Sequence, residues 1–251
     1  MADRDPWLVV RAPVPRPALR LFCLPYAGGN AGAFESWRTG LPRSVEVNAV
    51  QYPGRRERAT EAAPRRMTPL VQALEAALAP HLDRPYAVYG DCLGAYVAFE
   101  LVRRLARRGH RPADALVVSS AVPPHRCGVE PDYSTLDDAA FLAELVALGT
   151  LPPAVAGHPD LAAAALPAAR ADFELGRSYR LRDADPVATP VTVVVGDADP
   201  HVSAVDAAAW ADLTTAGCTT LTVPGGHDLL ARADAGLLRA VRTALTGKEP
   251  S

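Results

Sequence analysis

The chain has 251 residues with a formal net charge of -2, and 49% of the residues are hydrophobic. This length fits one α/β domain with an inserted subdomain and allows a sizeable core. The nearly balanced charge argues against nucleic-acid binding, and the apolar runs are all shorter than a membrane span. Because the charged N-terminal residues lack the apolar segment of a signal peptide, we expect a cytoplasmic protein.

The cysteines, Cys23, Cys92, Cys127 and Cys218, show neither a C-x-x-C pair nor zinc-ligand spacing. Their separations do not suggest a disulfide framework in a domain of this size. Cys23 and Cys218 lie in apolar or β-prone runs, where we expect small buried side chains. The sequence therefore predicts neither a metal site nor a disulfide framework.

Strands and helices are expected to alternate along most of the chain. Apolar and β-branched runs predict strands at 19–24, 45–51, 86–89, 115–119, 191–195 and 219–223. Helical spacing of apolar residues predicts helices at 68–79, 95–102 and 229–245. This alternation favours an α/β fold, with a mainly parallel central sheet and helices on both faces.

The segment 127–185 differs, because no convincing strand occurs in it. We expect helices there at 136–148 and 161–175, separated by turns rich in Gly and Pro. A helical insertion late in a parallel sheet suggests a lid over the site, and a purely structural role is the alternative. We therefore expect one domain over 1–251, with 127–185 as a helical lid insertion within it.

A glycine-flanked turn joins the strand at 86–89 to the next helix. Its sequence is Gly90-Asp91-Cys92-Leu93-Gly94, in the strand–turn–helix order that a nucleophile elbow requires. Small glycines allow the strained turn to close, and the helix N-terminus lies beneath the nucleophile. The central residue is cysteine where this elbow usually carries serine, so Cys92 is the predicted nucleophile.

The chain also supplies a base and an orienting acid after the elbow. One late strand ends in a loop that contains Asp197 and Asp199, and the next ends in a loop that contains His227. Loops at the carboxyl ends of parallel strands converge on one crevice, and the order nucleophile, acid, histidine is that of an α/β-hydrolase. We predict His227 as the base and favour Asp199 over Asp197 as the acid. His201 is the rival base, and we expect it to have a surface role.

Acyl transfer also requires hydrogen-bond donors for the developing oxyanion. The backbone N–H of Leu93, directly after the nucleophile, is the expected first donor. The second donor is expected from the segment 25–29, where small residues let the backbone approach the substrate. We nominate Ala27 for this role.

Several segments resemble the type II thioesterases of polyketide and nonribosomal peptide assembly lines, and the resemblance covers nearly the whole chain. They lie at 24–29, 34–42, 51–58, 172–179, 196–200 and 226–227. The resemblance implies an α/β-hydrolase with a mobile helical lid, acting on acyl or aminoacyl groups that phosphopantetheine tethers to acyl or peptidyl carrier proteins. No cofactor or metal is needed for this chemistry, we expect neither membrane nor nucleic-acid partners, and a monomer is the default. Candidate substrate contacts are Tyr26, Asp91, Phe141 and Phe173.

The elbow departs from the family pattern, which usually has the sequence Gly-His-Ser-x-Gly. Sulfur attacking a thioester forms another thioester, so acylation of Cys92 should be nearly isoenergetic, and the stored group stays reactive towards thiols and amines. Three functions remain open: hydrolysis of an acyl-Cys92 intermediate, transfer to a second carrier, and a non-catalytic carrier-binding role. Transfer has support in certain aminoacyl-shuttling enzymes that resemble this family and use cysteine. Asp91, the second departure, has either a structural role or a role in binding an amine-bearing acyl group.

Overall fold

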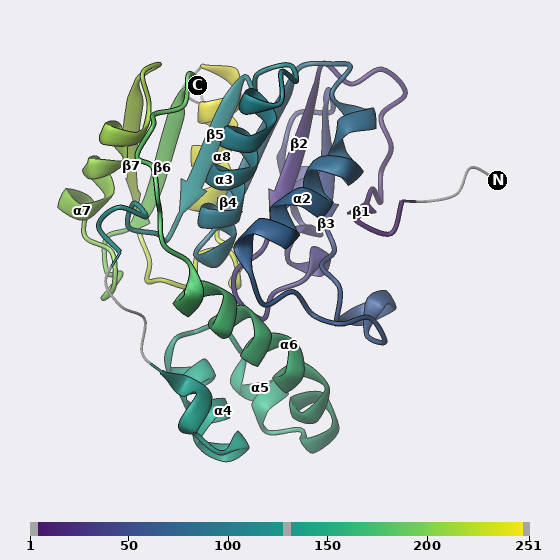
Figure 1. The fold of residues 1–251 in the computed structure, drawn as a ribbon, viewed down its shortest axis with the longest axis vertical. Helices are drawn as coiled ribbons and strands as arrows, with labels where there is room; N and C mark the ends of the chain where they lie inside the picture. The colour runs from purple at the N-terminus through teal and green to yellow at the C-terminus, as the bar shows by residue number, and fades with distance from the viewer. Residues whose placement is uncertain (1–4, 128–131, 248–251) are drawn as a thin grey trace.

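The computed structural model describes residues 5–127 and 132–247, and its central sheet has the strand order β1-β3-β2-β4-β5-β6-β7 (Figure 1). β1 (Leu8–Val9) pairs antiparallel with β3, and the other pairings are parallel. The parallel strands are β2 (Leu19–Leu24), β3 (Val45–Val50), β4 (Tyr86–Asp91), β5 (Ala115–Ser119), β6 (Val191–Gly196) and β7 (Cys218–Val223). These strands lie where the sequence predicts them, whereas β1 is too short to leave a pattern in the sequence.

Helices cover both faces of the sheet. α2 (Met67–Leu78) and α3 (Leu93–Arg107) lie on the face nearer the viewer in Figure 1, and α8 (Ala235–Thr246) lies behind the sheet. The short helix α1 (Trp37–Gly40) contributes Trp37 to the same core as α8, and α7 (Ala204–Ala208) follows β6. The predicted α/β architecture is therefore confirmed.

The side chains of β2 show how the sheet buries both of its faces. Phe22 and Leu24 belong to the hydrophobic core that α2 and α3 cover. Leu21 and Cys23, which point the other way, belong to the core that includes α8. Because both faces are covered, the strand is apolar at almost every position instead of alternating with polar residues.

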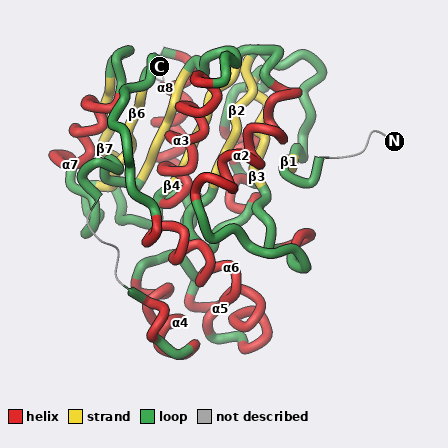
Figure 2. Tube along the Cα trace, viewed as in Figure 1, coloured by secondary structure: helices red, strands yellow, loops and turns green. Residues whose placement is uncertain are grey.

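Helices α4 (Asp138–Ala147), α5 (Pro153–Ala156) and α6 (Pro159–Ser178) lie between β5 and β6 in the chain. They gather beyond the carboxyl ends of the parallel strands, at the lower edge of the sheet in Figures 1 and 2. Buried side chains of α4 and α6 form a small core of their own, which includes Phe141 and Leu166. The helices expected at 136–148 and 161–175 are thus present, and residues 128–131 of the expected lid lie outside the described residues.

The C-terminal helix begins later than the sequence predicts. The prediction starts it at residue 229, whereas α8 begins at Ala235. Ala233 has a φ of 52°, which is incompatible with a continuous right-handed helix. The Asp234 side chain accepts hydrogen bonds from two backbone N–H groups of the first turn of α8. Asp234 is therefore an N-cap, and the apolar residues before it belong to turns.

The strand order places a crevice between the carboxyl ends of β2 and β4. β2 has β3 on one side and β4 on the other, so the chain reverses its direction of progress across the sheet at this point. Ligands of open α/β sheets bind at such a reversal. The loop that follows β2 and the elbow that follows β4 both meet there. In the described ranges, no helix is both long enough and apolar enough to cross a membrane.

Candidate active site

Cys92 lies at the sharp turn between β4 and α3. Its φ of 50° is in the left-handed region that residues other than glycine rarely adopt. Close packing requires the flanking glycines, because a Cβ on Gly90 would lie 2.2 Å from the carbonyl oxygen of Gly94. A Cβ on Gly94 would lie 2.4 Å from the carbonyl oxygen of Leu24. The turn therefore has the strained geometry of a nucleophile elbow, with Cys92 half-buried at the N-cap of α3.

His227, after β7, and Asp199, after β6, meet beside this turn. The Nδ1 atom of His227 lies 3.0 Å from Oδ2 and 3.2 Å from Oδ1 of Asp199. The imidazole lines the same cavity as the Cys92 side chain, and Cys92 contributes to raising the pKa of His227. The other candidate acid, Asp197, instead accepts a hydrogen bond from the backbone N–H of Gly225 at 3.0 Å. The structure thus brings Cys92, His227 and Asp199 together in the arrangement of a catalytic triad.

The groups around His227 favour its protonated form. Burial alone lowers the pKa of His227, but the hydrogen bond to Asp199, the interaction with Cys92 and the charge of Asp199 outweigh it and raise this pKa to about 11. Burial acts to raise the pKa of Asp199, yet hydrogen bonds from His227 and from the backbone of His201 and Val202 hold it below its usual value. An imidazolium paired with a carboxylate in this way can stabilise a neighbouring thiolate.

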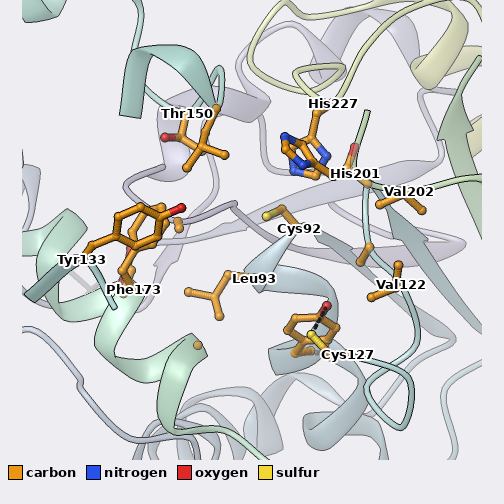
Figure 3. A pocket seen from close by; sticks show the side chains of 17 residues that line it. Cys92, Leu93, Val122, Cys127, Tyr133, Thr150, Phe173, His201, Val202 and His227 are labelled. Carbon is orange, nitrogen blue, oxygen red and sulfur yellow. Dashed lines mark hydrogen bonds between the residues drawn. The ribbon is translucent and has the colours of Figure 1, made fainter. Parts of the chain in front are cut away.

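A cavity of about 350 Å³ opens beside Cys92 and His227 (Figure 3). Its wall combines the elbow and α3 with side chains from the segment between β5 and β6, and most of it is apolar. The lining residues are Ala27, Cys92, Leu93, Tyr96, Ser120, Ala121, Val122, Cys127, Tyr133, Leu148, Thr150, Asp172, Phe173, Gly176, His201, Val202 and His227. Cys92 and His227 therefore face a space that can hold an acyl group.

The segment after β2 forms a tight turn beside the elbow. The Gly29 N–H donates to the Tyr26 carbonyl at 2.9 Å, and Gly28 has a φ of 77°, as in a type II turn. The N–H of Ala27 in this turn has no acceptor among the described residues, and the N–H of Leu93 lies in the first, unpaired turn of α3. Both residues line the cavity with Cys92, so the predicted oxyanion donors lie beside the predicted nucleophile.

Asp91 lies beneath the elbow rather than in the cavity wall. It is 2% exposed, and its carboxylate accepts hydrogen bonds from the Ser119 hydroxyl and, at 3.4 Å, from the Tyr89 hydroxyl. Burial raises the pKa of Asp91 to about 6, although the Ser119 hydrogen bond and the charge of His227 act against it. Asp91 therefore belongs to a buried polar network. Its burial favours the structural role, and Asp91 is not among the residues that line the cavity.

The other candidate substrate contacts divide into two groups. Phe173 on α6 lines the cavity. Phe141 is fully buried in the small core of α4 and α6, edge-on to Phe173 at 5.5 Å between ring centroids, and it is not among the lining residues. Tyr26 is partly buried against the core that includes α8, where burial and the charge of Asp91 raise its pKa to about 12. Phe141 and Tyr26 are thus not among the residues that line this cavity, and their roles as substrate contacts stay predictions.

The cavity is also lined by residues that the sequence analysis does not place there. His201 is exposed, as expected, but its ring lies edge-on to His227 at 5.1 Å between centroids and lines the cavity. Tyr133 and Thr150 line it from segments that carry no motif. Their positions depend on how the lid helices pack, which no local spacing reveals. Within 5–127 and 132–247, no group of three or more His, Cys, Asp or Glu residues is arranged to hold a metal ion.

Sequence comparisons place the chain among known proteins. The thioesterase domain model matches residues 19–245. The chain is 32% identical over 212 residues to the gramicidin S biosynthesis protein GrsT of Aneurinibacillus migulanus, a match that covers 84% of this chain and 83% of GrsT. It is 37% identical over 236 residues to the AMB antimetabolite synthetase AmbE of Pseudomonas aeruginosa. That match covers 94% of this chain but only 11% of AmbE, a far longer protein.

A solved structure extends the comparison to the fold. The type II thioesterase BorB from the borrelidin biosynthetic cluster is 33% identical, with a TM-score of 0.84 over 97% of this chain and 98% of that chain. These matches confirm the predicted α/β-hydrolase fold and the resemblance to type II thioesterases. The cysteine nucleophile stays a prediction. Since the family model spans the chain from β2 into α8, the chain belongs to the thioesterase family.

Proposed function

We propose that this chain is a thioester hydrolase in which Cys92 is the nucleophile, His227 the general acid and base, and Asp199 the group that orients His227. The observation that carries the proposal is the position of His227. Its Nδ1 atom lies 3.0 Å from Asp199, and its ring lies in the wall of the same cavity as Cys92, which contributes to raising the pKa of His227. Family membership supports thioester chemistry, and this geometry supports sulfur as the attacking atom.

In the first step, the Cys92 thiolate attacks the carbonyl carbon of the substrate thioester. The backbone N–H groups of Ala27 and Leu93 stabilise the negative charge that develops on the carbonyl oxygen. The bond from this carbon to the leaving sulfur then breaks, and the His227 imidazolium gives its proton to that sulfur. The products are an acyl-Cys92 thioester and a free thiol.

In the second step, neutral His227 takes a proton from a water molecule as the water oxygen attacks the acyl-Cys92 carbonyl carbon. The bond between this carbon and Sγ breaks, the free acid leaves, and the thiolate and imidazolium are restored. The side chain of Asp199 is fully buried, so its charge is little screened by solvent as it holds the imidazole in place.

The cavity favours acyl groups without a positive charge. Among the described lining residues, Asp172 is the one carboxylate, and hydrogen bonds from Arg55 and the Gly28 N–H already engage both of its oxygens. An ammonium group on the substrate would thus lack a partner in the wall and would meet the like charge of His227. We therefore propose that acyl thioesters without a free amine are better substrates than aminoacyl thioesters.

We further propose that these acyl groups are carried on the phosphopantetheine of a carrier protein. GrsT is named for gramicidin S biosynthesis, and BorB comes from a borrelidin biosynthetic cluster. The resemblance to type II thioesterases implies the same carrier-bound thioesters. Hydrolysis by this chain would release the acid and return a free carrier thiol.

Acyl transfer is the second candidate function, because the nucleophile is sulfur. The acyl-Cys92 thioester is close in energy to the substrate thioester, so a second carrier thiol can accept the group without an energetic cost. In that reaction His227 takes the proton of the incoming thiol instead of a proton of water. The function therefore depends on whether water or a second carrier thiol attacks acyl-Cys92 faster.

Product analysis separates the two functions. The protein is mixed with a carrier loaded with a hexanoyl group, with and without an empty second carrier, and the free acid and acylated carriers are quantified. Hydrolysis predicts release of free acid at the same rate in both mixtures and none from Cys92→Ala. Acylation of the second carrier with negligible free acid would establish transfer instead. A leucyl-loaded carrier should react more slowly than the hexanoyl-loaded one, and a faster leucyl reaction would contradict the proposed substrate class.

A further inference from the structure

One buried ion pair holds the turn that carries the proposed oxyanion donor. The Asp172 carboxylate on α6 accepts a hydrogen bond from the Gly28 N–H at 2.7 Å. The Arg55 guanidinium, from the loop after β3, donates to the Gly29 carbonyl oxygen at 2.8 Å. Arg55 and Asp172 also bind each other through two hydrogen bonds of 2.8 Å, one from each terminal nitrogen of Arg55. Consecutive residues of the turn are thus attached to the two members of one pair.

The pair is buried in a way that stability alone does not explain. Only 6% of the Arg55 side chain and 2% of the Asp172 side chain is exposed. The Nε atom of Arg55 is buried without a hydrogen-bond partner among the described residues. Desolvating two charges costs about as much as their attraction returns, so replacing a buried pair by apolar residues is often neutral or stabilising. The contacts of the pair with the turn supply another reason for its presence.

The geometry of the turn indicates what those contacts do. Gly28 has a φ of 77°, so the peptide between Ala27 and Gly28 has the type II orientation. Rotation of this peptide to the type I orientation would turn the Gly28 N–H away and reverse the Ala27 carbonyl. The hydrogen bond from Gly28 to Asp172 opposes this rotation, and the bond from Arg55 to Gly29 fixes the next residue. This rotation would leave the φ of Ala27 unchanged, so the contacts act on the turn as a whole. They attach the two residues after Ala27 to α6 and to the loop after β3, and so restrain the turn that carries the Ala27 N–H.

We propose that Arg55 and Asp172 are positioning residues for the oxyanion hole, fixing the turn at 26–29 so that the Ala27 N–H faces the oxygen of the tetrahedral intermediate. The proposal rests on the proposed function, because it presupposes attack by Cys92 on an acyl group. The proposal also requires the C-terminal half of α6, which carries Asp172 and is followed by Tyr179, to stay attached to the core. The Tyr179 hydroxyl donates to Glu100 of α3 at 2.7 Å, so this part of the lid is anchored to the core at a second point.

The test replaces the whole pair by apolar residues, Arg55→Met together with Asp172→Leu. Removing both charges avoids leaving either of them buried alone. The matched control removes a different ion pair of the same helix, Arg170→Met together with Asp138→Leu, whose nitrogen and oxygen atoms lie 2.8 Å apart and join α6 to α4. Two rates are measured at saturating reagent: acylation of Cys92 by an acyl-loaded carrier, followed by rapid quench, and alkylation of Cys92 by iodoacetamide.

We expect the Arg55/Asp172 variant to acylate Cys92 about 10²–10³-fold more slowly, the loss typical of removing one oxyanion donor. Alkylation should keep its wild-type rate, because it needs the thiolate but forms no oxyanion. The control variant should keep both rates. Normal acylation in a folded Arg55/Asp172 variant, or equal slowing of acylation and alkylation, would overturn the proposal.

A second variant covers the case in which the double variant does not fold. Arg55→Lys keeps a positive charge beside Asp172 but cannot make the two parallel hydrogen bonds. It should slow acylation and leave alkylation unchanged, and unchanged acylation would again overturn the proposal. If wild-type protein forms no acyl adduct on Cys92 at all, the proposed function fails instead.

Discussion

At the residue scale, His227 is influenced by two carboxylates that lie in different environments. Asp199 hydrogen-bonds to its Nδ1 atom at 3.0 Å, whereas the charge of His227 acts at longer range on buried Asp91 and opposes the rise in the pKa of Asp91. The pKa of Asp199 is held below its usual value, and burial raises the pKa of Asp91 to about 6. Substituting the two residues should therefore have different consequences, one for catalysis and the other for stability.

Asp199→Asn should impair catalysis while leaving the protein folded. The hydrogen bond and charge of Asp199 both raise the pKa of His227, so the substitution should lower that pKa and leave the imidazole poorly oriented. Turnover should fall by about 10⁴-fold, as when the orienting carboxylate of a catalytic triad becomes an amide. Steady-state kinetics and an NMR titration of His227 measure the two effects. The matched control is Asp197→Asn, in the same loop, and a larger loss of turnover in this control would show that the acid is misassigned.

Asp91→Asn should change how stability depends on pH. The pKa of Asp91 is about 6 in the folded protein and near 3.8 when unfolded, so between these values the folded protein binds more protons than the unfolded chain. The contribution of Asp91 to stability is therefore fully present below about pH 4 and is lost as the pH rises through about 6. The amide of the variant does not ionise, so the variant avoids the cost of a buried charged carboxylate. As the pH rises from 4 to 7, its free energy of unfolding should increase by about 1–3 kcal/mol relative to wild type.

Urea unfolding of both proteins across this pH range tests the prediction for Asp91. The control is Asp185→Asn, at a site whose side chain is 76% exposed, and its curve should stay parallel to that of the wild type. If the Asp91→Asn curve is also parallel to the wild type, the carboxylate is not titrating in the way its burial indicates.

At the element scale, the elbow depends on glycines for space rather than for flexibility. A Cβ on Gly94 would meet the backbone of β2 at 2.4 Å, and this backbone cannot move without disturbing the sheet. Gly94→Ala should therefore destabilise the fold by about 1–3 kcal/mol, the usual cost of overpacking. Gly157→Ala is the control, since its Cβ would lie 3.4 Å from the nearest atom, and it should unfold near the wild-type denaturant concentration. Equal stability of the two variants would show that the elbow has more room than this structure allows.

The elements that sequence predicts best are those whose pattern is set by burial. The strands around Cys92 are continuous apolar runs because the sheet is covered on both faces, and those runs are visible in the sequence. The start of α8 is harder to predict. The apolar residues before Asp234 continue the helical spacing, but the backbone of Ala233 is left-handed and interrupts the helix. Only the capping hydrogen bonds of Asp234 show where the helix begins.

At the scale of the whole molecule, the order of the loops explains why the triad could be predicted. Cys92, Asp199 and His227 each follow a parallel strand, so the topology alone brings them to one edge of the sheet. The ion pair of Arg55 and Asp172 spans 117 positions and joins a loop to a lid helix, so no spacing or strand order predicts it. Side-chain contacts of this kind depend on the packing of the lid against the core.

The substrate contacts are hard to predict from the sequence for the same reason, because they also depend on how the elements pack. Phe141 and Phe173 have equivalent helical spacing with their apolar neighbours, yet Phe173 lines the cavity and Phe141 is buried in the lid core. Which of two apolar side chains faces the cavity depends on the angle at which α4 and α6 meet. Periodicity identifies an apolar face of a helix, but it does not determine which neighbour that face contacts.

The most direct measurement is to trap the acyl group on the enzyme. Wild-type protein is mixed with excess acyl-loaded carrier, quenched with acid within milliseconds, and analysed by intact mass and peptide mapping. We predict the acyl mass on the peptide that contains Cys92, present in Cys127→Ala and absent from Cys92→Ala. Cys127 is the matched control because it also lines the cavity, with its Sγ 3.3 Å from the Tyr96 hydroxyl. Turnover without an adduct on Cys92, or an adduct on Cys127 instead, would contradict the assignment of Cys92 as the nucleophile.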